Sequence, residues 1–321
     1  MKEIILSVKD LKVRFFTRRG TVRAVDGISF DLLKGECLCL VGESGCGKTV
    51  TALSILGLID SPPGKIVRGE ILYDGLDLTK CPAERLRHIR GKEIAMIFQD
   101  AQSALNPVFT IGDQIVEQIR LHLEVSQQGA RDRAIGLLKE VGIPSPGEVA
   151  GYYPHQLSGG MRQRAMIAMS LSCDPQLLIA DEPTTAVDVT IKAQIIEILR
   201  RLKESRKMSI IFITHELGIV SEIGDRIVVM YAGRVAETAL ASELLKNPKH
   251  PYTSGLIKCL PDITQAKERL ESIPGTVPSL DNPPGGCLFN PRCNRAMAIC
   301  RKEQPPPVKV NKEHSVFCHL Y

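Results

Sequence analysis

The segment from Gly42 to Thr49 is the first place where residue types and spacing point to chemistry. It reads Gly-Glu-Ser-Gly-Cys-Gly-Lys-Thr and satisfies the phosphate-binding pattern G-x-x-x-x-G-K-[ST]. It follows the apolar run Cys37–Val41 and precedes an apolar stretch, as expected of a loop that joins a strand to a helix. Glycines let backbone N–H groups turn inward around a phosphate, and a helix N-terminus adds a favourable dipole. The segment therefore predicts a site for the phosphates of a nucleotide.

Single residues of this loop have expected roles. Lys48 can reach the β- and γ-phosphates, and the Thr49 hydroxyl can ligate Mg²⁺. A chance match to the pattern in a chain of this length has a probability of about one in a hundred. The thiol of Cys46 is expected to be a passenger in this chemistry, although the residue lies in the loop. The other residues expected at the nucleotide are Gly42, Ser44, Gly45, Cys46, Gly47 and Val50.

An acidic pattern further along complements the loop. The four apolar residues Leu177–Ala180 run directly into Asp181 and Glu182. A buried strand that ends in an acid places a carboxylate at the carboxyl edge of a parallel sheet, where α/β folds bind ligands. Asp181 is expected to hold Mg²⁺ through its water shell, and Glu182 to polarise an attacking water. An apolar strand ending in Asp-Glu is commonplace alone, but together with the phosphate loop it predicts hydrolysis of a nucleoside triphosphate.

Four further motifs, in the correct order along the chain, resemble those of the ABC ATPases. Leu157–Gln163 reads Leu-Ser-Gly-Gly-Met-Arg-Gln and resembles the family's signature motif, with Met161 where the family commonly has Gln. Gln99 follows a strand-like segment and looks like the Q-loop glutamine. Thr185–Asp188 looks like the D-loop, and His215 like the switch histidine.

The resemblance implies roles for these residues. Phe15, with Phe16 as the competing choice, would stack on adenine. Gln99 would sense the γ-phosphate and Mg²⁺, while His215 would hold the γ-phosphate and the attacking water in line. Two chains would sandwich two ATP molecules, and closing and opening of this dimer would supply a conformational stroke. The residues that would contact the γ-phosphate held by the facing subunit are Ser158, Gly159 and Gly160.

Three shorter segments narrow the resemblance. Tyr153–Gln156, Ala104–Pro107 and His250–Thr253 look like the oligopeptide/dipeptide/nickel importer branch, and most like the first ATPase subunit of dipeptide and oligopeptide importers. This implies a peripheral protein at the cytoplasmic face of the cell membrane that powers the import of dipeptides or oligopeptides. The implied partners are two transmembrane permease subunits, a second ATPase subunit in a heterodimer, and an extracytoplasmic peptide-binding protein. Nickel remains an alternative cargo, because such an ATPase does not touch the substrate.

Strand and helix signals alternate along most of the chain, which favours an α/β core with a mostly parallel sheet. The resemblance makes this an ABC-type P-loop ATPase core of mixed sheet plus helical subdomain. We expect an ATPase domain over 1–246, with the helical subdomain at about 100–160, and a proline- and cysteine-rich C-terminal extension over 247–321. Predicted strands are Ile4–Leu11, Thr21–Phe30, Glu36–Val41, Glu70–Tyr73, Glu93–Phe98, Leu177–Ala180, Ser209–Thr214 and Ile227–Tyr231. Predicted helices are Thr49–Gly57, Glu84–Arg90, Gln114–Val125, Arg131–Val141 and Ile191–Ser205.

Composition argues against other classes of protein. The formal net charge of +5 is spread along the chain without a Lys/Arg run, so it gives little support for a nucleic-acid partner. The alternative of an ABC ATPase acting on nucleic acid is further disfavoured by a single cassette and the absence of heptads. No apolar stretch approaches the roughly 18 residues that a membrane span needs. The N-terminal segment lacks the layout of a signal peptide, so we expect a cytosolic chain.

Four of the ten cysteines lie in the last 35 residues: Cys287, Cys293, Cys300 and Cys318. They have no C-x-x-C spacing, which disfavours a zinc ribbon, and disulfides are disfavoured in the cytosol. Four thiolates in a proline-rich segment with little core suit a [4Fe–4S] cluster, and the resemblance implies one; Zn²⁺ and unligated cysteines are the alternatives. A structural role is favoured over redox sensing.

The remaining histidines and cysteines have simpler expectations. His314 and His319 are possible substitute ligands but are expected to be exposed residues of the tail. The other six cysteines are expected to be inert thiols: Cys37, Cys39, Cys46, Cys81, Cys173 and Cys259.

Overall fold

The computed structural model describes residues 3–18, 20–185, 188–259 and 272–321. The chain divides into two compact units. The first unit comprises residues 1–80 and 213–321, and the second unit comprises residues 81–212. Each is described by itself.

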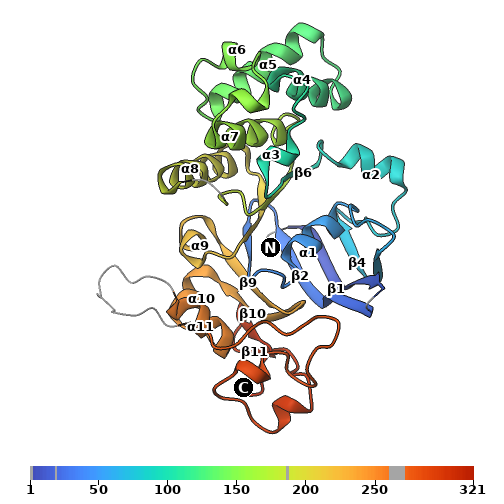
Figure 1. Ribbon diagram of the computed structural model, residues 1–321, viewed down its shortest axis with the longest axis vertical. Coiled ribbons are helices and arrows are strands. Elements are labelled where there is room, and N and C mark those ends of the chain that lie inside the picture. The colour runs from blue at the N-terminus through green and yellow to red at the C-terminus, as the bar shows by residue number, and fades with distance from the viewer. Residues whose placement is uncertain (1–2, 19, 186–187, 260–271) are drawn as a thin grey trace. The chain divides into compact units, whose positions relative to one another are not determined.

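One sheet of the first unit is antiparallel, in the order β2-β1-β4-β5 (Figure 1). Its strands are β1 (Ile4–Thr17), β2 (Gly20–Leu33), β4 (Gly64–Tyr73) and β5 (Leu76–Asp77). The β4–β5 hairpin turns at Asp74 and Gly75, which both have positive φ. Asp-Gly is a favoured pair for a two-residue hairpin turn, because both residues tolerate that conformation.

The other strands of the first unit form a mixed sheet. Strand β3 (Cys37–Val41) runs parallel to β9 (Arg226–Tyr231), which pairs antiparallel with β10 (Arg234–Leu240). All five residues of β3 are buried, as its apolar sequence requires. Two short strands of the C-terminal segment, β12 (Ser315–Val316) and β11 (Val308–Lys309), extend the sheet beyond β10. The helices of this unit are α1 (Lys48–Ile55), α9 (Leu217–Ile223), α10 (Ala241–Lys246) and α11 (Pro251–Lys258).

The second unit combines parallel strands with most of the helices. Strand β6 (Ile94–Ile97) runs parallel to β7 (Leu177–Asp181), and β8 (Ser209–Thr214) lies next to β7. Helices α4 to α7 gather into one group, as Figure 1 shows. Side-chain caps begin several of these helices, including Thr110 before α4 and Ser126 before α5. The helices are α2 (Ala83–Ile89), α3 (Ala101–Ala104), α4 (Ile111–His122), α5 (Gln127–Glu140), α6 (Pro146–Val149), α7 (Gly159–Ser170) and α8 (Val189–Arg206).

The predicted α/β class is confirmed: the fold combines mixed β-sheet with a group of helices. Boundaries differ where local signals were weak. Strand β1 continues to Thr17 instead of Leu11, because bulges between Val8 and Phe15 interrupt the alternation on which the prediction relied. Helix α4 begins at Ile111, three residues before the predicted Gln114, because Thr110 caps it.

The prediction that His314 is exposed is wrong. Its ring is buried, and Nε2 lies 2.7 Å from Oε1 of Glu237, which is itself fully buried. The Glu237 carboxylate also accepts the backbone N–H groups of Lys249 at 2.6 Å and His250 at 2.9 Å. A buried carboxylate needs such partners, so Glu237 ties β10, the start of α11 and the C-terminal segment together.

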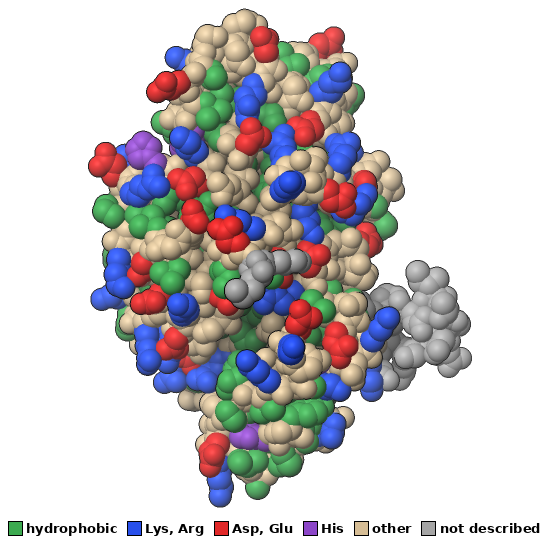
Figure 2. All heavy atoms as spheres, turned by 180° about the vertical axis from the view of Figure 1, so that it is seen from behind, with side chains coloured by type: hydrophobic (Ala, Val, Ile, Leu, Met, Phe, Trp, Pro, Cys, Tyr) green, Lys and Arg blue, Asp and Glu red, His purple; other side chains and the backbone are tan. Residues whose placement is uncertain are grey.

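Charged side chains of both signs are interspersed over the face shown in Figure 2. In the part of the chain that the structure describes, none of the helices has the length and apolar character needed to span a bilayer.

Candidate functional site

The phosphate loop of the first unit has the predicted setting between β3 and α1. Gly47 precedes α1 with a φ of 101°, a conformation that L side chains rarely adopt. At Gly42 the constraint is space, because a Cβ there would lie 2.2 Å from the carbonyl oxygen of Met230 and 2.7 Å from Cys46 Sγ. The glycines of the pattern are therefore required by this backbone.

The ammonium of Lys48 lies within the loop. Its Nζ donates to the carbonyl oxygen of Gly42 at 2.6 Å and to that of Glu43 at 3.1 Å, and the residue is only 5% exposed. The outer residues Ser44, Gly45 and Thr49 are exposed. A buried cation thus lies beneath an accessible rim of backbone N–H groups and hydroxyls, a suitable arrangement for phosphate oxygens.

Cys46 is buried beneath this rim. Burial raises the pKa of its thiol, although the neighbouring Lys48 ammonium acts in the opposite direction. A neutral buried thiol packs as a small apolar group.

Sequence analysis missed how the loop is anchored at Glu43. The Glu43 N–H donates to the hydroxyl of Tyr252 at 2.9 Å, and its carboxylate pairs with Arg292 at 3.0 Å. Tyr252 belongs to the His250–Thr253 segment, which resembles a family branch but carries no predicted role in the nucleotide site. This resemblance is the sequence signal that could have pointed to the contact between Tyr252 and Glu43.

In the second unit, parallel pairing brings two predicted catalytic residues together. Ile97 of β6 pairs with Ala180 of β7, and Gln99 and Glu182 each follow two residues later. Gln99 Nε2 donates to Glu182 Oε2 at 3.1 Å. Glu182 has a φ of 47°, an uncommon conformation for a residue other than glycine, and such positions cluster at functional sites. Its neighbour Asp181 is buried at the end of β7.

The signature residues begin helix α7. Ser158 is the N-cap, and its side chain accepts the N–H of Met161 at 3.3 Å, while Gly159 and Gly160 form the first turn. Ser158 and Gly159 are exposed beside a hollow of about 430 Å³. The first turn therefore presents backbone N–H groups to an approaching anion.

The structure gives less information about the roles of the remaining predicted site residues. His215 is exposed directly after β8 and belongs to the first unit. Phe15 packs against Gly64 on the neighbouring strand, whereas Phe16 is 54% exposed. In the segment resembling a D-loop, residues 186 and 187 lie outside the described residues, and Asp188 caps α8.

The four C-terminal cysteines form what we call the cysteine cluster. Burial raises the pKa of Cys287 to about 11, and the nearby thiols of Cys300, Cys318 and Cys293 act in the same direction. Burial also raises the pKa of Cys293 and that of Cys318, each with Cys300 nearby. The four thiols are therefore within electrostatic reach of one another.

One sulfur of the cysteine cluster accepts a backbone N–H in hydrogen-bond geometry. This sulfur belongs to Cys300, and the donor is Met297, at 3.4 Å. Such N–H···S bonds stabilise the thiolate form that metal ligation requires. The backbone N–H groups of Phe289, Arg295 and Leu320 act to lower the pKa of the Cys287, Cys293 and Cys318 thiols respectively, against the larger effect of burial.

The spacing of these sulfurs bears on the two predicted metals. Among the described residues, no three His, Cys, Asp or Glu side chains have the geometry to hold a single metal ion. A mononuclear Zn²⁺ needs sulfurs about 2.3 Å from one point. In a [4Fe–4S] cluster each cysteine would bind one of the cluster's irons. The described residues show no metal site at the cysteine cluster, for zinc or for iron.

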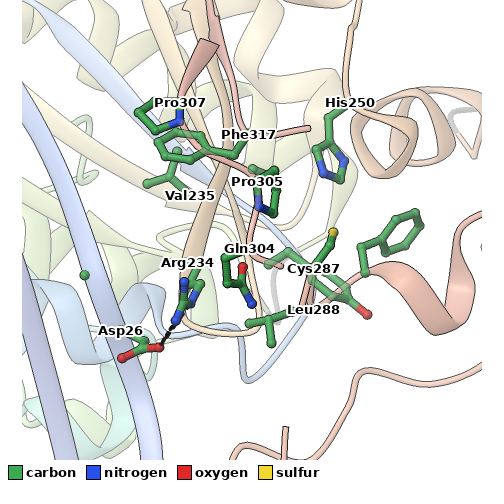
Figure 3. A pocket seen from close by; sticks show the side chains of 14 residues that line it. Asp26, Arg234, Val235, His250, Cys287, Leu288, Gln304, Pro305, Pro307 and Phe317 are labelled. Atoms are coloured by element: carbon green, nitrogen blue, oxygen red, sulfur yellow. Dashed lines mark hydrogen bonds and ion pairs between the residues drawn. The ribbon is translucent and has the colours of Figure 1, made fainter. Parts of the chain in front are cut away.

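A cavity of about 250 Å³ lies beside Cys287 in the first unit (Figure 3). Apolar side chains including Leu288, Val235 and Phe317 line it, and the ion pair of Asp26 with Arg234 lies at one side. Nothing in its lining indicates a particular ligand.

The phosphate loop on strand–loop–helix geometry, the paired Gln99 and Glu182, and the capped signature turn define a P-loop ATPase of the ABC class. Residues 25–185 match the family described as "ABC transporter", and residues 236–300 match the "Oligopeptide/dipeptide transporter, C-terminal region". The chain belongs to the ABC transporter family of ATP-binding proteins.

Its relatives are similar over nearly their whole length. The chain is 48% identical to the dipeptide transport ATP-binding protein DppD of Bacillus subtilis (strain 168), covering 99% of this chain and 95% of DppD. It is 49% identical to the oligopeptide transport ATP-binding protein OppD of the same organism, covering 97% and 87%. The DppD of Escherichia coli (strain K12) is also 49% identical, covering 98% and 96%.

Solved structures agree on the fold. The dimeric structure of MJ0796, a bacterial ABC transporter cassette, superposes with a TM-score of 0.67 and 26% identity. The match covers 74% of this chain and 98% of that cassette. A post-hydrolysis state of the same cassette, bound to ADP and Pi, gives the same TM-score at 25% identity.

Proposed function

We propose that this protein is the ATP-hydrolysing subunit that powers the import of dipeptides or oligopeptides through a membrane ABC transporter. The observation that carries the proposal is near-full-length similarity to proteins named for dipeptide and oligopeptide transport, together with the C-terminal match over residues 236–300. The same names favour peptides over the nickel alternative.

In this proposal the residues divide the work of phosphoryl transfer. Lys48 would exchange its hydrogen bonds with loop carbonyls for bonds to the β- and γ-phosphates, and Thr49 would ligate Mg²⁺. Asp181 and Gln99 would be further residues that hold Mg²⁺, which would neutralise charge on the phosphates. Glu182 takes the proton of the attacking water, and His215 aligns that water with the γ-phosphate. Either Phe15 or Phe16 stacks on adenine, with the greater exposure favouring Phe16.

The exposed signature turn supports a composite site. Ser158, Gly159 and Gly160 present a helix N-terminus to solvent, which suits a γ-phosphate carried by a facing ATPase subunit. The proposed assembly pairs this chain with a second, different ATPase subunit at the cytoplasmic face of the membrane. Two permease subunits and an extracytoplasmic peptide-binding protein complete it.

Two measurements test this function. Affinity purification from detergent-solubilised membranes should recover two transmembrane proteins and a second ATPase with this chain; recovery of the chain alone would contradict the assembly. Cells lacking the gene should regain uptake of labelled dipeptide or oligopeptide from the wild type but not from Lys48→Ala. Restored uptake of nickel but not of peptide would assign the alternative cargo.

We also propose that Cys287, Cys293, Cys300 and Cys318 hold a [4Fe–4S] cluster with a structural role. Support comes from the mutual electrostatic influence of the four thiols and from the backbone N–H that Met297 donates to Cys300 Sγ. The bound cluster would supply cross-links between segments that have few large apolar side chains of their own.

Anaerobic purification with iron, zinc and acid-labile sulfide analysis tests this metal assignment. The expected result is about four irons and four sulfides per chain, with both lost in Cys300→Ser and retained in Cys259→Ser. Zinc without acid-labile sulfide would assign the zinc alternative. If the chain contains neither iron nor zinc, the proposal that these cysteines bind a metal is overturned.

A further inference from the structure

Arg292, in the described part of the C-terminal segment, donates hydrogen bonds to both backbone and side-chain acceptors. It ends the short helix η2 (Asn290–Arg292), directly before Cys293 of the cysteine cluster. Its Nε donates to the carbonyl oxygen of Pro274 at 2.8 Å, and its Nη1 lies 3.1 and 3.0 Å from the two carboxylate oxygens of Glu43. Only 6% of the Arg292 side chain is exposed.

Aromatic rings hold this guanidinium in place. Its Cζ lies 5.8 Å from the centre of the Tyr231 ring and 5.9 Å from that of Phe289, within the range of cation–π attraction. Tyr252 packs against both rings, with centroid distances of 4.6 Å to Tyr231 and 5.4 Å to Phe289. The charge is therefore fixed by a packed group and is not a mobile surface arginine.

Glu43 receives contacts from this group at both its side chain and its backbone. The carboxylate meets Arg292, while the N–H donates to the hydroxyl of Tyr252 at 2.9 Å. The third polar group of Glu43, its carbonyl oxygen, accepts from Lys48 Nζ at 3.1 Å. Consecutive contacts thus connect Arg292, through Glu43, to the lysine that faces the phosphates.

We propose that Arg292 is a positioning residue for the phosphate loop. By holding Glu43, it fixes the backbone on which Lys48 and the loop N–H groups are arranged, and so raises the affinity for MgATP. Because Arg292 adjoins Cys293, the conformation of the cysteine cluster segment is coupled to that affinity. The inference rests on the proposed role of the loop in binding ATP.

The chemistry of the ion pair between Arg292 and Glu43 predicts which substitutions should weaken nucleotide binding. An ion pair whose cation is nearly buried is costly to break on one side, because the remaining charge keeps its desolvation penalty without its partner. Removing both charges should lower the binding free energy by less than the sum of the two single changes. The difference measures the coupling between Arg292 and Glu43. Lysine keeps the charge at position 292 but loses the planar fork that reaches Glu43 and Pro274 together.

The test measures binding of a fluorescent ATP analogue with Mg²⁺ to the full-length chain, with thermal unfolding as a check on folding. Arg292→Ala is expected to weaken affinity about tenfold, with Arg292→Lys intermediate. Glu43→Gln is expected to resemble Arg292→Ala, and the double variant should be no worse than either. The exposed Arg301→Ala, from the same segment, serves as the matched control and should bind as the wild type does.

Kinetics separate positioning from general damage. In the assembled transporter, Arg292→Ala should raise KM for ATP with little change in kcat, whereas a destabilised chain would lose both in proportion to unfolded protein. If Arg292→Ala does not fold, Arg292→Lys and Glu43→Gln decide the question. Wild-type affinity in these two variants, or additive effects in the double variant, would overturn the proposal. Wild-type affinity in Lys48→Ala would instead overturn the nucleotide site itself.

Discussion

The amide nitrogen of Gln99 lies 3.1 Å from a carboxylate oxygen of Glu182, across 83 positions of sequence. The pair follows from the register of two parallel strands, since Ile97 opposite Ala180 leaves the residues two positions later side by side. The hydroxyl of Thr185 donates to the same Glu182 oxygen at 3.0 Å. Two donors on one oxygen fix the orientation of the carboxylate, as the proposed role of Glu182 as a base requires.

Replacing this carboxylate should separate binding from hydrolysis. Glu182→Gln keeps the shape of the side chain but removes the basic oxygen, so ATP hydrolysis should fall at least about a hundredfold. MgATP affinity should stay near the wild-type value, and an ATP-bound dimer should accumulate. Steady-state phosphate release and size-exclusion chromatography with MgATP measure the two effects. Glu222→Gln, at an exposed site, is the control, and hydrolysis by Glu182→Gln at the wild-type rate would refute its role as base.

Removing the lysine of the phosphate loop should act on binding instead. Lys48 contributes a buried cation with two hydrogen bonds to loop carbonyls, which bound phosphates would replace. Lys48→Ala should weaken MgATP binding by about a hundredfold, the value of a strong charge-assisted contact. Isothermal titration with MgATP gives the affinity, and the exposed Lys65→Ala is the matched control. Equal affinity in Lys48→Ala and Lys65→Ala would exclude the proposed phosphate contact.

The sequence predicts local features of this protein better than contacts between residues that are far apart in the chain. The phosphate loop and the acidic end of β7 are short segments whose residue types determine their local backbone, so their settings were predictable. The anchor between Glu43 and Arg292 spans 249 positions, and that between Glu237 and His314 spans 77. Such pairs depend on how the C-terminal segment packs. The local periodicity of apolar residues in the sequence does not indicate this packing. His314 was misassigned for this reason, because a tail histidine looks exposed until its buried partner is known.

The signature turn allows a matched comparison between two helix caps. Ser158 caps α7 and Ser126 caps α5, each by accepting a backbone N–H within its first turn. Changing either residue to Ala should cost about 1 kcal/mol of stability. Only Ser158→Ala should also reduce ATP hydrolysis by the assembled transporter, because in the proposed composite site only this turn would contact the nucleotide of the facing subunit. Isolated chains of both variants should bind MgATP as the wild type does. Equal hydrolysis by the two variants would remove Ser158 from the composite site.

The stability of the first unit should depend on pH through Asp26. This carboxylate accepts hydrogen bonds from Arg14 and Arg234. Burial alone would raise its pKa, but the two guanidinium groups outweigh burial and hold the pKa below its usual value of 3.8. A lowered pKa in the folded state means that the stabilisation is complete above the ordinary value and is lost as pH falls through the lowered one.

Asp26→Asn tests this dependence. At pH 7 the free energy of unfolding of the variant should be about 2 kcal/mol lower than that of the wild type, because two partly buried guanidinium groups lose their counterion. The difference should remain constant down to about pH 5 and then shrink below about pH 4, as the wild-type carboxylate becomes protonated. Urea unfolding followed by circular dichroism at several pH values measures it, with the exposed Asp132→Asn as a control expected to stay within about 0.5 kcal/mol of wild type. A difference that grows as the pH falls would show that the Asp26 pKa is raised and not lowered.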